Sequence, residues 1–372
     1  MKIIGIGSVA FVLVVLQKLI YKNFWYKNLY VSISFKQHGI FEGEEGEVIE
    51  VIENRKWLPL MMLKVKFQTS RNLGFFGETG SKTTDQYYRN DIFQVGGGEK
   101  ITRKLRFTGN KRGYYHIKNI DLMASDLFFM DENMKSMSTE NYLYVYPKTF
   151  PCENLKYSLQ KLNGEIIVKR HMLEDPFEYR GIREYQPFDD IRSVNWKATA
   201  RTGALKVNQK NYTAMQTIRI FLNLEDDGIL EKENEIEASM QIAMGIARFF
   251  LLQGMKVSCY ANGRDILTDE HMELQGLSSI GQLEVLGKAF ARIDTTKQVK
   301  PFVELFERTI LKDTDGVFTF FISPNGYDAF VELMKKCKNE KIDYIWYYPV
   351  MYYEKPTISP ELEMYMKVLS VS

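Results

Sequence analysis

Residues 179–207 read YRGIREYQPFDDIRSVNWKATARTGALKV, a stretch that mixes charged and aromatic side chains. A solvated run of charges has no need for aromatic residues, and a strand in a hydrophobic core does not tolerate so many charges. The mixture therefore predicts either partly buried ion pairs or a charged recognition surface. The residues on either side of this stretch differ in pattern, and they indicate what the stretch connects.

The composition sets limits on the class of protein. A length of 372 residues allows two or three domains, and 45% hydrophobic with 26% charged residues is ordinary for a folded chain. The net charge of +2 gives no reason to expect a nucleic-acid partner. The 3 cysteines form no CxxC pair and the 4 histidines have no metal-ligand spacing, so neither a disulfide scaffold nor a zinc site is predicted.

The amino-terminal segment is apolar. Residues 3–16 read IIGIGSVAFVLVVL, and residues 3–21 would span about 28 Å as a helix, close to the thickness of a bilayer core. Phe24, Trp25 and Tyr26 follow, where an aromatic belt is expected. The segment lacks a small-residue cleavage site, so we expect a retained membrane anchor over residues 1–28 rather than a signal peptide.

The flanking charges predict an orientation for this anchor. Lys18, Lys22 and Lys27 outnumber Lys2 plus the terminal amino group. The positive-inside rule then gives a single-pass protein of the cell membrane, with the bulk of the chain in the cytoplasm.

Residues 29–150 show short alternating runs separated by glycine-rich turns, which is typical of strands. In one run, residues 100–108, Arg103 shares a strand face with Ile101, Leu105 and Phe107. Several strands without a helix predict an antiparallel β-sandwich of the immunoglobulin-like kind. The runs are LYVSISF, GEVIEVIEN, LMMLKVKFQ, DQYYRNDIFQV, KITRKLRFT, GYYHIKNIDL and NYLYVYP.

Residues 216–372 change to an alternation of strands and helices. The apolar run TIRIFLNL is followed by a helical pattern over residues 231–254 and then by the strand MKVSCYA. Similar units follow, so we expect a doubly wound parallel sheet with helices on both faces. Ligands bind outside the carboxyl ends of such strands, which directs attention to loops 223–228 and 323–326.

The stretch quoted first carries a family resemblance. Its run R-E-Y-x-P-x-D-D-x-R-x-x-x-W-K-A-x-A-R-T-G-x-L-x-V resembles the signature of the bacterial family called domain of unknown function 58. The resemblance implies a membrane segment, a β-rich region, the signature, and then a von Willebrand factor A-like domain. Such proteins are typically associated with MoxR-type AAA+ ATPases, and the family has no established activity. Its members often carry two membrane helices, whereas one is visible here.

The resemblance also implies a test for metal binding. Von Willebrand factor A domains that bind Mg²⁺ use Asp-x-Ser-x-Ser after the first strand, with a Thr and an Asp from later loops. Here the first position reads Asn223-Leu224-Glu225-Asp226-Asp227, and the later loop reads Ser323-Pro324-Asn325. We therefore predict no metal or other cofactor. The degenerate candidate site consists of Asn223, Glu225, Asp227 and Ser323.

Three interpretations of the signature stay open. It could form an ion-pair network under Trp196 that clamps the two domains together, or present arginines to an acidic partner. It could also be catalytic, with Asp189 or Asp190 as acid or base and Arg201 holding an anion. No catalytic residue is assigned, because no nucleophile, histidine and carboxylate set accompanies the stretch. The candidate interaction residues are Arg183, Glu184, Tyr185, Asp189, Asp190, Arg192, Trp196, Lys197 and Arg201.

The sequence thus predicts a multidomain chain with all-β and α/β parts. Its expected segments are the anchor at 1–28, the sandwich at 29–150, the connecting signature segment at 151–215 and the α/β domain at 216–372. We expect an interaction or adaptor protein rather than an enzyme, working with a MoxR-type ATPase in envelope-linked assembly or maturation. The alternative is a metal-dependent hydrolase acting at the strand ends of the α/β domain.

Overall fold

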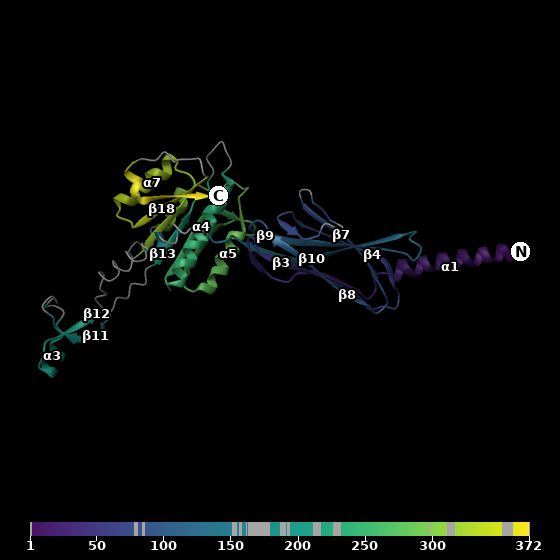
Figure 1. Ribbon diagram of the computed structural model, residues 1–372, viewed down its shortest axis with the longest axis horizontal. Helices are drawn as coiled ribbons and strands as arrows, with labels where there is room; N and C mark the ends of the chain where they lie inside the picture. The colour runs from purple at the N-terminus through teal and green to yellow at the C-terminus, as the bar shows by residue number, and fades with distance from the viewer. Residues whose placement is uncertain are drawn as a thin grey trace. The chain divides into compact units, whose positions relative to one another are not determined.

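A computed structural model describes residues 2–77, 81–83, 86–150, 155, 158–160, 162, 179–186, 191, 194–210, 217–225, 232–295, 297, 299–310, 317–351 and 360–371. The chain divides into two compact units (Figure 1). Unit 1 comprises Met1–Lys148 with Gly287–Arg292, and unit 2 comprises Thr149–Leu286 with Ile293–Ser372.

Unit 1 begins with helix α1 (Lys2–Phe24), drawn in purple in Figure 1. Within the described part of the chain, no helix is both long and apolar enough to cross a membrane, which corrects the expected membrane helix. The expected aromatic belt is also wrong at one position, because Trp25 is buried in the hydrophobic core of unit 1 together with Tyr21. The Tyr21 hydroxyl donates a hydrogen bond to the Pro59 carbonyl at 2.9 Å, which joins the end of α1 to the strands.

The strands of unit 1 form two sheets. One has the order β1-β3-β8-β5 and is antiparallel throughout. The other has the order β2-β10-β9-β4-β7-β6. Their bounds are β1 Leu29–Phe35, β2 Gly39–Phe41, β3 Glu45–Asn54, β4 Leu60–Ser70, β5 Leu73–Phe75, β6 Ser81–Thr83, β7 Gln86–Val95, β8 Lys100–Gly109, β9 Gly113–Ser125 and β10 Glu132–Tyr146.

Buried and exposed side chains alternate along the strands of these sheets, and the buried ones form the core of the sandwich. Every second residue of β7 is buried, and β3 and β8 pair so that Val48 lies opposite Leu105 with both side chains buried. Alternation of this kind directs one face of each strand to the core. The strand-rich prediction for this region is confirmed, but the prediction of a purely antiparallel sandwich is wrong, because β2 pairs parallel with β10.

Unit 2 is built on a larger sheet with the order β15-β14-β13-β17-β18-β19, and β16 pairs with β14. Apolar runs form the central strands, where Ile220, Phe221 and Phe320 are fully buried. The strands are β13 Thr217–Leu222, β14 Lys256–Asp265, β15 His271–Leu277, β16 Ile293–Asp294, β17 Val317–Ile322, β18 Tyr344–Met351 and β19 Met366–Val371. The helical elements are α4 Glu233–Leu252, η2 Ile280–Gln282, α5 Leu283–Ala291, α6 Phe302–Ile310, α7 Asp328–Asn339 and η3 Pro360–Tyr365.

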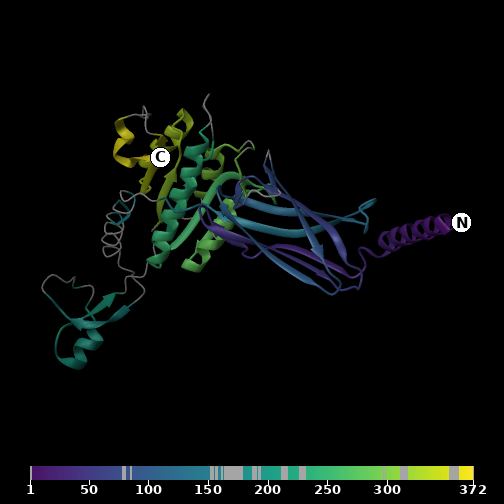
Figure 2. The same ribbon diagram turned by 45° about the vertical axis from the view of Figure 1, so that its right-hand side comes forward.

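Helices cover both faces of this sheet. On one face Phe250 of α4 lies 5.5 Å from Phe320 of β17, measured between ring centroids. On the other face α6 and α7 pack against the rings of Phe221, Phe321 and Trp346. Figures 1 and 2 show α4 beside β13 from two directions. The helices predicted at 231–254 and in the later segments are present, and Gly254 follows α4 with a positive φ of 71°.

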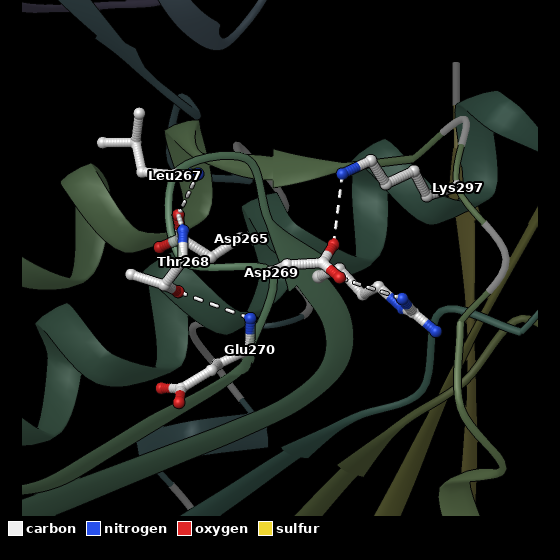
Figure 3. Close-up of polar contacts among 7 residues, drawn as sticks. Asp265, Leu267, Thr268, Asp269, Glu270 and Lys297 are labelled. Atoms are coloured by element: carbon white, nitrogen blue, oxygen red, sulfur yellow. Dashed lines mark hydrogen bonds and ion pairs between the residues drawn. The ribbon is translucent and has the colours of Figure 1, made fainter.

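The expectation of a wholly parallel sheet is wrong, because the sheet is mixed. The central pairs are parallel, but β15 and β16 both run antiparallel to β14. A tight turn between β14 and β15 reverses the chain direction in β15 (Figure 3). The Asp265 carboxylate accepts hydrogen bonds from the backbone of Leu267 at 2.8 Å and Thr268 at 3.3 Å, as aspartates commonly do in turns.

The far side of the same turn is held by charge. Asp269, which has a positive φ of 57°, pairs with Lys297 at 3.2 Å, drawn in Figure 3, and with Arg264, also at 3.2 Å. The hydrogen bond from Lys297 is the main cause that lowers the pKa of Asp269. The chain therefore returns directly beside β14 as an antiparallel edge strand, with no helix between the two strands.

Candidate functional site

The signature forms a two-stranded sheet with a short helix, which we call the signature hairpin: the described residues of β11, β12, α3 and the segments between them. Strand β11 (Tyr179–Glu184) pairs antiparallel with β12 (Lys206–Lys210), so that Arg183 lies opposite Val207. Helix α3 (Trp196–Thr202) lies between them in sequence and next to β12 in space (Figures 1 and 2).

Local hydrogen bonds define both ends of α3. The side chain of Asn195 accepts a hydrogen bond from the backbone of Ala198 at 3.0 Å, which is an N-cap. At the other end Gly203 has a φ of 69°, in the left-handed region that glycine tolerates, and its N–H donates to the Thr199 carbonyl at 2.9 Å. The Thr202 hydroxyl donates to the Ala198 carbonyl at 2.9 Å. The run NWKATARTG thus contains its own helix start and stop.

The helix is attached to β12 by further bonds. The backbone N–H of Asn195 donates to the Lys206 carbonyl at 2.8 Å, and its side-chain amide donates to the Asn208 side chain at 2.6 Å. Val194 forms an isolated bridge with Val207, and both valines are buried. The backbone of the signature hairpin is therefore fixed by contacts within the hairpin itself.

Several large apolar side chains of this hairpin are exposed. Trp196 is 65% exposed, and Ile182, Ile191 and Leu205 are exposed as well. The cations Lys197 and Arg201 also lie on the surface. Aromatic and arginine side chains are enriched in protein contact surfaces, and the signature hairpin exposes both.

The structure brings together only part of the predicted interaction set. Arg183 donates to the carbonyl of Glu184 at 3.0 Å, and the Glu184 carboxylate pairs with Lys206, also at 3.0 Å. Tyr185 is half-buried. Trp196, which the clamp interpretation expects to pack over the ion pairs, is 65% exposed among the described residues. Asp189, Asp190 and Arg192 lie outside the described residues.

The second candidate site lies at the carboxyl ends of the central strands of unit 2. Asn223 follows β13 and Ser323 follows β17, and both side chains are buried. The Asn223 amide donates to the Ser323 hydroxyl at 3.1 Å and its carbonyl oxygen accepts from Asn262 at 3.1 Å. We call Asn223, Glu225, Asn262, Ser323 and Asn325 the strand-end cluster.

Two charged side chains, Glu225 of the cluster and the neighbouring Lys232, make further hydrogen bonds there. The Glu225 carboxylate accepts hydrogen bonds from the backbone of Phe302 at 2.9 Å and from the Tyr327 hydroxyl. The ammonium group of Lys232 donates to the side chain of Asn325 at 2.7 Å and to the Pro324 carbonyl at 3.2 Å. The oxygens considered for a metal are thus engaged with protein donors. Asp227 lies outside the described residues.

Sequence reasoning placed Asn223, Glu225 and Ser323 at one edge of the sheet, and the structure brings these three together. It missed Asn262, Lys232 and Tyr327. Asn262 had a usable signal, because it lies near the end of a strand parallel to β13 and its neighbours, where side chains gather. Lys232 and Tyr327 had none, because each approaches from a loop next to a helix. Within the described part of the chain, no group of three or more His, Cys, Asp and Glu side chains is placed to hold a metal ion.

Comparison with protein families gives one match. A family model described as "Protein of unknown function DUF58" matches residues 181–255, which include most of the signature hairpin, β13 and α4. The match supports the DUF58 family, in agreement with the resemblance of the signature run. No curated protein matches this sequence.

Solved structures give only distant similarity. The CARDB domain of a Pyrococcus furiosus protein is 12% identical and covers 32% of this chain and 96% of its own, with a TM-score of 0.21. A cohesin module from a Clostridium perfringens family 33 glycoside hydrolase is 11% identical and covers 32% of this chain and 96% of its own, with a TM-score of 0.22. The sporulation control protein Spo0M of Bacillus subtilis is 12% identical and covers 43% of this chain and 58% of its own, with a TM-score of 0.19. TM-scores this low carry no argument about function.

Proposed function

We propose that this chain is an interaction or adaptor protein of the DUF58 family, and that its signature hairpin carries the contact with its partner. The observation behind the proposal is Trp196, which is 65% exposed on a helix that is capped at both ends. The family match to residues 181–255 and the strand-rich fold fit an interaction role.

The physical basis is the low cost of ordering such a surface. Binding energy at protein interfaces is concentrated in a few residues, with tryptophan and arginine enriched among them. The internal hydrogen bonds of the signature hairpin fix its backbone before a partner arrives, so little backbone entropy is lost on binding. Burial of the Trp196 ring against a partner would then contribute favourably.

For the partner we propose a MoxR-type AAA+ ATPase, acting with this chain in envelope-linked assembly or maturation. The support is the family resemblance, together with the exposed cations Lys197 and Arg201 on the same helix as Trp196. Exposed cations of this kind increase the association rate with an acidic surface. The expected location at the cell membrane, with most of the chain in the cytoplasm, stays a prediction that fractionation of cells would test.

The proposal can be tested by replacing Trp196 with a photo-crosslinking amino acid in cells that express the full-length chain. Trp57 is a matched control, because it is 76% exposed and lies outside the signature hairpin. We expect crosslinks to an AAA+ ATPase from position 196 and not from position 57. In parallel, Trp196→Ala should reduce capture of that ATPase at least tenfold without a change in melting temperature, whereas Trp57→Ala should leave capture intact. Full capture by a stably folded Trp196→Ala variant contradicts the proposal.

The alternative of a metal-dependent hydrolase at the strand ends has less support in the geometry of the cluster. Its support would be free, converging carboxylates at this edge of the sheet. In the described residues the Glu225 carboxylate is instead bonded to Tyr327 and to the backbone of Phe302, and Lys232 places a positive charge against Asn325.

A further inference from the structure

The turn between β9 and β10 presents large apolar side chains to solvent. Residues 126–131 read DLFFMD, and we call the four central residues, Leu127, Phe128, Phe129 and Met130, the apolar tip. All four are exposed, by between 42% and 61%. Apolar residues scattered singly over a surface are common, but four in succession on one turn mark a contact with a protein or with a membrane.

The apolar tip is held in a fixed conformation. The Asp126 carboxylate, on a residue that is 1% exposed, accepts hydrogen bonds from the backbone of Met130 at 2.7 Å and from the side chain of Gln17 at 2.8 Å. Gln17 lies on α1 and accepts a hydrogen bond from the backbone of Leu127 at 3.3 Å. Phe129 has a positive φ of 57°, which is rarely tolerated by a bulky residue. The turn therefore holds a strained backbone while it exposes its apolar side chains.

The hydrogen bonds of Gln17 join the apolar tip to the exposed apolar surface of α1. The exposed apolar residues of this helix are Phe11, Val12, Leu13, Val15, Leu16, Leu19 and Phe24. At about 100° per residue, the run from Phe11 to Leu13 already spans about 200° of the helix circumference. A protein groove contacts a helix along one apolar face, whereas lipid can surround it. The breadth of this surface favours a lipid contact.

The charged groups next to the apolar tip are compatible with the surface of a bilayer. The two carboxylates that follow the tip are paired within unit 1, Asp131 with Lys18 at 3.0 Å and Glu132 with Lys64 at 2.5 Å. Paired carboxylates are repelled by anionic lipid less than unpaired ones. Lys22 is exposed one helical turn after Lys18, and a lysine side chain can extend from an apolar surface to the level of the head groups.

We propose that the apolar tip inserts into the interfacial layer of a lipid bilayer, with the exposed surface of α1 lying against the same lipid. Apolar side chains in such contacts enter the boundary between head groups and acyl chains to a depth of about 5–10 Å. The contact is made at the bilayer surface, so it does not depend on a helix that crosses the bilayer. The inference rests on the membrane location proposed above, and it is independent of the signature hairpin and of the ATPase.

Photo-crosslinking of the purified full-length chain tests the inference in vesicles of phosphatidylcholine and phosphatidylglycerol. A photo-crosslinking amino acid replaces Phe128 in one sample and Phe76 in the other. Phe76 is the matched control, because it is 55% exposed in the same unit and follows β5, which begins beyond the end of β4 that is remote from the apolar tip. We expect a lipid adduct at Phe128 and none at Phe76. A crosslinked dimer in place of a lipid adduct, adducts at both positions, or no lipid adduct at Phe128 overturns the proposal.

Oxidation by hydroxyl radicals reports on the same contact without a crosslinker. Vesicles should protect Met130 from oxidation, compared with the chain in the absence of lipid. Phe128→Glu places a carboxylate in the apolar tip and should lose most of this protection, whereas Phe76→Glu should keep it. Both side chains are exposed, so neither change should lower the melting temperature. Equal oxidation of Met130 in the two variants refutes the proposal. Fractionation of the chain with cell membranes would in that case leave the proposed location intact.

Discussion

Replacement of the buried Glu50 by glutamine should remove a pH dependence of stability from unit 1. Glu50 lies on β3 with 1% of its surface exposed, and it accepts a hydrogen bond from Nε of Arg103 at 2.8 Å. The Nη2 atom of Arg103 contacts the Asp91 carboxylate of β7. The charges of Glu50, Arg103 and Asp91 therefore connect the two sheets of the sandwich. Among the described residues, no donor bonds the second carboxylate oxygen of Glu50.

The size of this pH dependence of the free energy of unfolding follows from the pKa of the Glu50 carboxyl. Burial raises the pKa of Glu50 to about 7 from an ordinary value of 4.5, although Arg103 opposes the rise and the charge of Asp91 adds to it. Each pKa unit corresponds to about 1.4 kcal/mol, so the full effect is about 3 kcal/mol. Because the folded pKa is the higher one, this stability is present below pH 4.5 and is lost as the pH rises to 7.

Glu50→Gln cannot titrate, so its stability relative to the wild type should rise by about 3 kcal/mol between pH 4.5 and pH 8. The assay is urea unfolding at a series of pH values, followed by a short pulse of hydrogen exchange at one common pH. Mass spectrometry of peptides from β3 and β8 then reports on unit 1 alone. A separate readout is needed because the two units of the chain need not unfold together.

Glu47→Gln is the matched control on the same strand. A hydrogen bond from Lys36 at 2.7 Å is the main cause that lowers the pKa of Glu47. The stability from this carboxylate is therefore lost only in more acidic solution, and the control should follow the wild type between pH 5 and pH 8. If the difference between Glu50→Gln and the wild type stays constant over the same range, the folded carboxyl titrates normally and the reasoning is refuted.

Two further substitutions test the candidate sites. Asn195→Ala removes the N-cap of α3 and should destabilise the signature hairpin by about 1 kcal/mol, seen as faster hydrogen exchange in α3 but not in β14. Unchanged exchange in α3 would show that the cap is not stabilising. Asn223→Ala removes the buried hydrogen bonds that the Asn223 side chain makes with Asn262 and Ser323 and should cost unit 2 about 1–3 kcal/mol, measured by its urea midpoint. An unchanged midpoint would show that the strand-end cluster contributes no net stability.

The parts of the fold that the sequence predicted are those where the side-chain period is strong. Every strand proposed in residues 29–150 is present, because one buried face per strand imposes alternation. The same alternation placed Arg103 on the inner face of β8, beside Leu105 and Phe107. It could not predict the acceptors of that arginine, because Glu50 and Asp91 come from two other strands whose pairing is set by tertiary contacts.

The fold errors lie at edges, where the sequence signal is weak. Strand β15, HMELQGL, has few strongly apolar residues, and its buried and exposed positions do not alternate, so no periodicity marked it. Its direction depends on the turn held by Asp265 and Asp269, which is a feature of side-chain hydrogen bonds and not of hydrophobic pattern. Strand β19 was missed for the same reason, since much of it is exposed. Edge strands need only one partner and one buried face, so their sequences are less constrained.

The candidate sites divide in a similar way. The strand-end rule found Asn223 and Ser323 at one edge, because parallel strands end together. It did not predict that Lys232 would supply a positive charge there, because a lysine in a loop gives no positional signal. For the signature, the mixture of charges and aromatics predicted either partly buried ion pairs or a charged recognition surface, and the sequence alone could not decide whether Trp196 was buried or exposed.

The structure separates the residues of the signature run into two groups. Gly203 is required by the positive φ that ends α3, and Val207 is buried against Val194. These residues build the hairpin. Trp196, Lys197 and Arg201 are exposed and are not needed for any described contact that forms it. A large aromatic ring in water gains no hydrophobic stabilisation for the fold. The exposed group therefore calls for an explanation outside the fold of the hairpin, and contact with a partner supplies one.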